Sequence, residues 1–203
     1  MLTRLENVQN TTEMQLLSNY GALLTGHFVL SSGRHSDTYV QCARILQWPV
    51  QASLLGNQLA QRFYQFSSKD LVIVSPAMGG ILIGQEVARA LNTKHMFTER
   101  TTRGFQLRRG FELDSSNKVI IIEDVITTGK STEEVISVVK RHNAEVVAIG
   151  SIINRSATLT NNLLYEYLLK VEANNWHVDD CPLCAKGVPT EKPGSRGEVK
   201  MLV

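Results

Sequence analysis

The sequence has few cysteines, little net charge and no long hydrophobic run. Its 203 residues include three cysteines, Cys42, Cys181 and Cys184, a low and odd count that argues against a disulfide framework and predicts a reducing cytoplasm. The formal net charge of +2 gives no reason to expect a nucleic-acid or membrane partner. No run of about 18 uncharged apolar residues occurs, so no membrane span is expected. Residues 1–12 contain no apolar signal core.

What remains is the pattern of an ordinary globular α/β chain. Hydrophobic residues make up 43% and charged residues 20%, and the length suits one compact domain with a small appendage. Short apolar segments alternate with longer helical patterns. The pattern predicts strands at 71–74, 96–97, 119–122 and 146–153, and helices at 14–24, 49–66, 79–91 and 129–142. This alternation predicts a central, mostly parallel sheet flanked by helices.

Residues 119–132 carry the strongest chemical signal. Four β-branched residues predict a buried strand, and two acids, Glu123 and Asp124, follow where the strand is expected to leave the core and meet solvent. The next turn, rich in small and hydroxylated residues, enters a helix. Its backbone N–H groups and the positive end of the helix dipole predict an anion site. Two carboxylates beside a phosphate cradle suit a ligand with vicinal hydroxyls and a phosphate, such as ribose 5-phosphate.

Two other interpretations fit the same window. A core strand can end in two solvated acids before an ordinary helix start, and this would be structural only. The spacing from Asp124 to Ser131, Asp-x-x-x-x-Gly-Lys-Ser, also matches a P-loop whose first glycine is replaced. An aspartate at that position would place negative charge beside the phosphates, which disfavours the P-loop.

The window resembles the binding motif for phosphoribosyl pyrophosphate (PRPP) of the type I phosphoribosyltransferases: four hydrophobic residues, two acids, then Thr-Thr-Gly. The resemblance implies that the acids contact the ribose hydroxyls, that Asp124 is catalytic and that the turn wraps the 5′-phosphate. It also implies Mg²⁺ as cofactor, held mainly by PRPP. The PRPP-binding residues it implies are Glu123, Asp124, Val125, Ile126, Thr127, Thr128, Gly129, Lys130, Ser131 and Arg100.

Further segments are similar to orotate phosphoribosyltransferases. Residues 21–36 resemble the opening hood segment of that family, and Ala77, Met78, Gly79 and Gly80 lie in a segment that resembles its pyrophosphate loop. Arg155 follows the strand at 146–153, where the family places an arginine that grips the substrate carboxylate. A guanidinium can hold the carboxylate of orotate through two parallel hydrogen bonds. Thr127 is expected as a second contact to the ring. The alternatives are a surface arginine and a plain turn threonine.

The sequence departs from many bacterial members in two places. Ser31 stands where these carry a lysine, and the mobile-loop region, residues 99–111, contains arginines but no lysine or histidine. Arg100 and Arg103 are therefore predicted as the catalytic cations of the loop. A solvated basic hairpin is the alternative.

The resemblance implies one phosphoribosyltransferase domain, with a hood formed by residues 1–45 and C-terminal elements, a PRPP-binding core at 46–172 and an extension at 173–203. It implies a homodimer that uses PRPP and orotate to make orotidine 5′-monophosphate and pyrophosphate in pyrimidine synthesis. Two alternatives stay open: a purine-base phosphoribosyltransferase, and a regulator that keeps the PRPP site but binds nucleic acid without catalysis.

The C-terminal cysteines form the pattern His177-x-x-x-Cys181-Pro-Leu-Cys184. These three residues have spacings that a zinc site can use, with Asp179, Asp180 or a partner subunit as the fourth ligand. A reduced turn without metal is the favoured interpretation. Cys42 is expected as a buried small hydrophobe. His27, His35 and His95 each stand alone in the sequence and are expected to be structural or surface residues.

Overall fold

The computed structural model describes residues 12–30, 32–155 and 162–193. Its larger sheet has six strands in the order β5-β4-β3-β6-β7-β8. All neighbouring pairs are parallel except β4 and β5, which form an antiparallel hairpin. The strands, from one edge to the other, are β5 (Gly104–Leu107), β4 (Lys94–Thr101), β3 (Leu71–Pro76), β6 (Lys118–Ile126), β7 (Glu145–Asn154) and β8 (Leu164–Lys170).

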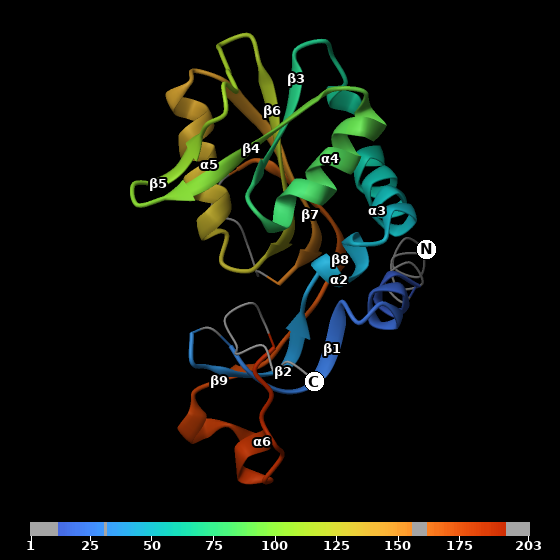
Figure 1. Ribbon diagram of the computed structural model, residues 1–203, viewed down its shortest axis with the longest axis vertical. Coiled ribbons are helices and arrows are strands. Elements are labelled where there is room, and N and C mark those ends of the chain that lie inside the picture. Colours follow the sequence, from blue (N-terminus) through green and yellow to red (C-terminus); the bar gives the residue numbers. More distant parts are fainter. Residues whose placement is uncertain (1–11, 31, 156–161, 194–203) are drawn as a thin grey trace, which may run out of the picture.

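Helices cover both faces of this sheet. Figure 1 shows α3 (Pro49–Gln61) and α4 (Gly79–Leu91) on one face and α5 (Lys130–Arg141) on the other. Side chains of β6 alternate between the two layers: Ile120 and Ile122 pack in the core under α3 and α4, whereas Val119 and Ile121 pack under α5. The unbroken apolar run of β6 is therefore the pattern of a strand buried on both faces.

A smaller sheet lies beneath the larger one in Figure 1. It has the order β1-β2-β9 and consists of β1 (Leu23–Val29), β2 (His35–Val40) and β9 (Asn175–Trp176). The sheet thus joins an N-terminal hairpin to a strand near the other end of the chain. The remaining elements are a helix over residues 12–19, α2 (Ala43–Leu46), η1 (Tyr64–Phe66), η2 (Val178–Asp180) and α6 (Pro182–Ala185).

The predicted sheet and its order of elements are confirmed, with changes at the boundaries. The strand expected at 96–97 extends over Lys94–Thr101 because β3 and β5 pair with it on both sides. The helix expected at 49–66 ends at Gln61, and η1 continues the chain. Strand β8 was not predicted. Among the described residues, none of the helices has the length and apolar character needed to cross a membrane.

Candidate active site

The two acids lie within the last residues of β6. The expectation that they meet solvent was wrong for Glu123, which is 7% exposed, because β6 continues to Ile126 and β7 pairs with it along this stretch. Asp124 is partly buried. Successive residues of a strand point to opposite faces, so the two carboxylates diverge. A Cβ atom on Gly79, at the start of α4, would lie 2.5 Å from Asp124 Oδ1, which places the Asp124 carboxylate on the α4 side.

Burial changes the proton affinity of both acids. Burial, with a smaller contribution from the neighbouring Asp124 carboxylate, raises the pKa of Glu123 to about 9. Burial also raises the pKa of Asp124, and backbone hydrogen bonds oppose that rise. A carboxyl group with this proton affinity is a strong hydrogen-bond partner for hydroxyl groups, and a cation or donor brought by a ligand would favour its ionised form.

The start of α4 meets the end of β6 at close range. Besides the contact between Gly79 and Asp124, a Cβ atom on Gly80 would lie 2.8 Å from the carbonyl oxygen of Ile122. At position 80, only glycine fits without displacing the strand, because the added atom would meet its backbone. Residues 77–80, predicted as a pyrophosphate loop, therefore lie against the acidic strand end, and Met78 within this loop is 83% exposed.

The turn after β6 has the features of an anion site. Thr127 and Thr128 are exposed, and Gly129 adopts a left-handed conformation (φ 76°) immediately before α5. No side chain caps the first turn of α5, so backbone N–H groups at this end remain available to a ligand. The Lys130 N–H donates only a long hydrogen bond, 3.4 Å, to Thr128 Oγ1.

Arg155 lies at the end of β7, next to the same turn. Its backbone N–H donates to the carbonyl oxygen of Ile126 (2.8 Å). Burial lowers the pKa of its guanidinium, and the Asp37 carboxylate opposes that effect. Asp37 belongs to β2 of the smaller sheet and accepts a hydrogen bond from Asn174 Nδ2 (2.7 Å). The Asp37 carboxylate of the smaller sheet thus acts electrostatically on the Arg155 guanidinium, and sequence patterns alone had not linked the two residues.

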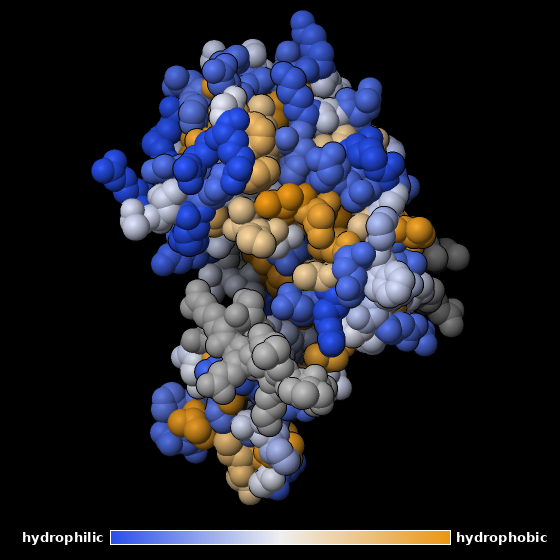
Figure 2. Space-filling model, viewed as in Figure 1, coloured by the Kyte–Doolittle hydropathy of each residue, from blue (hydrophilic) through white to orange (hydrophobic). Residues whose placement is uncertain are grey.

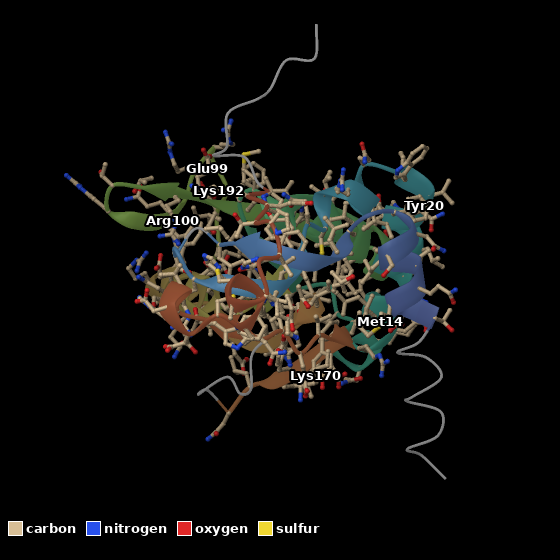
Figure 3. The ribbon with its side chains drawn as sticks, turned by 90° about the horizontal axis from the view of Figure 1, so that it is seen from below. Met14, Tyr20, Glu99, Arg100, Lys170 and Lys192 are labelled. Atoms are coloured by element: carbon tan, nitrogen blue, oxygen red, sulfur yellow. The ribbon has the colours of Figure 1, made fainter. Side chains whose placement is uncertain are left out.

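The arginines predicted for the mobile loop lie on the β4–β5 hairpin. Arg100 forms an ion pair with Glu134 of α5 (3.0 Å), and its guanidinium carbon lies 4.2 Å from the centre of the Phe105 ring. Arg103 is exposed in the turn of the hairpin. Figure 3 shows Glu99 and Arg100 together on this hairpin, on the opposite side of the molecule from Met14 and Tyr20. Both arginines therefore belong to a basic hairpin, and Arg100 connects this hairpin to α5 through its ion pair with Glu134.

The surface between the two sheets is mixed in character. Figure 2 shows hydrophobic side chains gathered on the larger unit where it faces the smaller sheet, with hydrophilic side chains around them. A site of this kind suits a ligand with a planar ring and charged groups. Cys42 is fully buried, as predicted. It lies next to the second acid, since its thiol donates a hydrogen bond to the backbone oxygen of Asp124 (3.8 Å).

Comparison with known proteins agrees with this arrangement. The phosphoribosyl transferase domain model matches residues 41–185. The orotate phosphoribosyltransferase of Thermotoga maritima is 44% identical over 184 residues, covering 90% of this chain and 97% of that protein. The chain belongs to the orotate phosphoribosyltransferase family. The enzyme of the same name from Desulforamulus reducens is 45% identical over 90% of this chain and 95% of its own length.

Solved structures of orotate phosphoribosyltransferases share the fold. The Aeropyrum pernix structure has a TM-score of 0.66 and 23% identity, and covers 77% of this chain and 92% of that one. A Mycobacterium tuberculosis structure, in complex with inorganic phosphate, has a TM-score of 0.62 and 21% identity over 80% of this chain and 95% of that one. Membership of the family excludes the P-loop interpretation, and β6 itself extends through Asp124, where a P-loop would already have begun.

The structure does not support the alternative in which His177 joins Cys181 and Cys184 in a zinc site. His177 pairs with Asp179 (3.1 Å), and both side chains are largely exposed. Two other histidines lie next to Cys181 and Cys184 instead. They are His27 and His35, which are buried side by side although they had been expected to stand alone. The two histidines are eight residues apart in sequence, on different strands of a hairpin, so only the pairing of β1 with β2 brings them together.

Proposed function

We propose that this protein transfers the ribose 5-phosphate group of PRPP to orotate, giving orotidine 5′-monophosphate and pyrophosphate. The observation that carries the proposal is the meeting of three segments at one edge of the sheet: the acids at the end of β6, the glycine turn at the start of α4, and Arg155 at the end of β7. Ligands of parallel α/β sheets bind at this edge.

Each segment has a distinct role in the proposal. Backbone N–H groups of the turn over residues 125–131 hold the 5′-phosphate, with the hydroxyls of Thr127 and Thr128 as further donors. The carboxyl groups of Glu123 and Asp124 bind the ribose hydroxyls. The turn over residues 77–80 holds the pyrophosphate group beside Asp124. Arg155 holds the carboxylate of orotate, and Thr127 contacts its ring.

The reaction then needs orientation and charge stabilisation. A ring nitrogen of orotate loses its proton to solvent and forms the new bond to the anomeric carbon, while the bond from that carbon to pyrophosphate breaks and its electron pair leaves with the pyrophosphate. Holding the two reactants in line can lower the barrier by about 7–11 kcal/mol. Arg100 and Arg103 would stabilise charge on the leaving group. In the present conformation Arg100 pairs with Glu134, so it must leave that partner to reach a ligand.

Magnesium fits the site as a substrate-borne ion. Mg²⁺ prefers oxygen ligands and is usually held by one or two carboxylates together with substrate phosphates. Glu123 and Asp124 offer carboxylate oxygens at the end of β6, although their divergence means that PRPP would supply most of the ligands. When bound, Mg²⁺ would neutralise negative charge on the pyrophosphate.

The choice of orotate over a purine base rests on Arg155. Purine bases carry no carboxylate, so a half-buried guanidinium at this edge would have no partner among them. In a spectrophotometric assay with PRPP and Mg²⁺, we expect turnover with orotate and none with adenine or hypoxanthine. Arg155→Ala should raise the KM for orotate at least about tenfold, since a charged hydrogen bond contributes roughly 1.5–3 kcal/mol, and should leave the KM for PRPP nearly unchanged.

Equal effects of Arg155→Ala on both KM values would contradict its assignment to the base, and turnover with a purine would contradict the proposed acceptor. Arg44→Ala is a matched control: Arg44 also lies outside the core, and its guanidinium bonds only the carbonyl oxygen of Gly21 at 3.4 Å in the described contacts. A regulator without catalysis would bind PRPP in calorimetry and show no turnover at all.

Two properties accompany this proposal. The chain is expected to act as a homodimer whose β4–β5 hairpin reaches the partner's site, and light scattering on the purified protein tests the mass. Its three free thiols suit a reducing cytoplasm.

A further inference from the structure

We propose that His27, His35, Cys181 and Cys184 bind a structural zinc ion that fastens the C-terminal segment to the smaller sheet. This site lies outside the residues assigned to PRPP and orotate. Its four ligand atoms, two ring nitrogens and two sulfurs, all lie within 4.8 Å of one another. Two cysteines and two histidines are a donor set typical of closed zinc sites.

Three of the separations between these atoms match the edges of a coordination tetrahedron. With Zn–N near 2.0–2.1 Å and Zn–S near 2.3 Å, a tetrahedral site has edges of about 3.3–3.8 Å. His27 Nε2 lies 3.4 Å from Cys181 Sγ and 3.7 Å from Cys184 Sγ. Cys184 Sγ lies 3.3 Å from His35 Nδ1. The two ring nitrogens are closer, 2.8 Å apart, so the histidines need to separate by about half an ångström to admit the ion.

One histidine is already oriented for metal binding. His27 Nδ1 lies 2.8 Å from the carbonyl oxygen of Val188, an acceptor only, so this nitrogen carries the proton and donates it. In the neutral ring, His27 Nε2 then presents a lone pair to the centre of the cluster. Zinc-bound histidines commonly donate their second N–H to a carbonyl or carboxylate in this way.

Hydrogen bonding alone explains this cluster poorly. His35 Nδ1 and both thiols approach the single lone pair of His27 Nε2, which can accept only one good hydrogen bond. The cysteines are free rather than joined in a disulfide. A divalent ion would engage all four atoms, and two thiolates would balance its charge in a buried place, where a net charge is costly.

The C-terminal segment has almost no buried side chain that would anchor it to the smaller sheet. Between residues 172 and 193, Cys181 is the one buried residue. A segment without an apolar core is commonly stabilised by a metal or by disulfides. Its position here depends on hydrogen bonds with the same hairpin. The Glu191 N–H donates to the His27 carbonyl oxygen, and the Val29 N–H donates to the Glu191 carbonyl oxygen. The Arg34 guanidinium donates to the Asn175 carbonyl oxygen, and Asn174 Nδ2 donates to the Asp37 carboxylate. A zinc ion would join His27 and His35 to cysteines that lie 146 (181 − 35) to 157 (184 − 27) positions further along the chain.

Zinc content tests the proposal directly. Protein purified without chelators should contain about one zinc ion per chain, by elemental analysis. Cys184→Ser should lose most of it. His177→Gln is the matched control, because His177 lies near the cysteines in sequence but outside the cluster, and its zinc content should equal that of the wild type. If His177→Gln loses zinc and His35→Gln keeps it, the assigned ligands are wrong.

Cobalt gives a readout that does not depend on whether the variants fold. Wild-type protein stripped with a strong chelator and reloaded with Co²⁺ should show the thiolate charge-transfer band and the intense visible bands of a tetrahedral site. Stripping should also speed tryptic cleavage at Lys186, an exposed residue after the cysteines, and Zn²⁺ but not Mg²⁺ should restore resistance. Folded protein that takes up neither Zn²⁺ nor Co²⁺, or whose mass shows a Cys181–Cys184 disulfide, would overturn the proposal.

Discussion

A single methyl group at Gly79 tests the contact on which the active site depends. In Gly79→Ala, the new Cβ atom would lie 2.5 Å from Asp124 Oδ1 and 2.6 Å from Oδ2, whereas real Cβ atoms essentially never approach closer than 3.0 Å. The difference, 3.0 minus 2.5, requires the carboxylate to move by 0.5 Å or more. Because a misplacement of about 1 Å can cost about 10²-fold in rate, we expect kcat/KM to fall about 10- to 100-fold.

Stability should respond differently from activity. Gly79 is the first residue of α4 and is not among the glycines with positive φ, so alanine can adopt its backbone conformation. At such positions Gly→Ala typically stabilises a protein by about 0.4–1 kcal/mol through the unfolded chain. The clash opposes this gain, so the free energy of unfolding should change by less than about 1 kcal/mol while activity falls.

The assay is steady-state kinetics with orotate, PRPP and Mg²⁺, together with urea unfolding of the same preparations. Leu82→Ala is the control, since Leu82 lies on the same helix and is 49% exposed. It should keep the wild-type kcat/KM. A Gly79→Ala enzyme with unchanged kcat/KM would show that the position of the Asp124 carboxylate does not matter for catalysis, and the proposed roles of both loops would be wrong.

Three further predictions concern other parts of the molecule. Burial raises the pKa of Glu123 from 4.5 to about 9, so the folded protein is most stable at low pH, where this carboxyl group is neutral. As the pH rises from 4.5 towards 9, the free energy of unfolding of the wild type should fall relative to that of Glu123→Gln, by up to about 1.4 kcal/mol per pH unit. An equal pH dependence of the two free energies, measured by urea unfolding, would contradict the shift. Gly56→Ala should destabilise the protein by about 1–3 kcal/mol, because its Cβ would lie 2.4 Å from Glu86 Cβ where α3 packs on α4, and an unchanged unfolding midpoint would refute that packing. Arg100→Ala and Arg103→Ala should each lower kcat about 10- to 100-fold, because each would remove charge stabilisation of the pyrophosphate. Wild-type kcat in both variants would exclude the hairpin from catalysis.

Local order in the sequence was sufficient to predict the sheet and to recognise the segment to which we assign PRPP binding. Four β-branched residues, two acids and a glycine turn follow one another between residues 119 and 129, so no distant part of the chain is needed to recognise them. The same holds for Arg155, whose place after an apolar strand puts it at the ligand-binding edge of a parallel sheet.

Tertiary structure decided which side chains meet across the chain. Strand pairing beyond Ile122 buries Glu123, although two adjacent acids are typical of a solvated strand end. Gly79 meets Asp124 only because α4 begins beside β6, forty-five residues earlier in sequence.

The metal-ligand cluster is the clearest case. Its cysteines were visible as a pair, but spacing along the chain favoured His177, which the structure leaves exposed. His27 and His35 join the pair because β1 and β2 form a hairpin and the C-terminal segment folds back onto it. Sequence patterns record neighbours along one strand or one helix, whereas contacts across 150 residues follow from packing that no local pattern encodes.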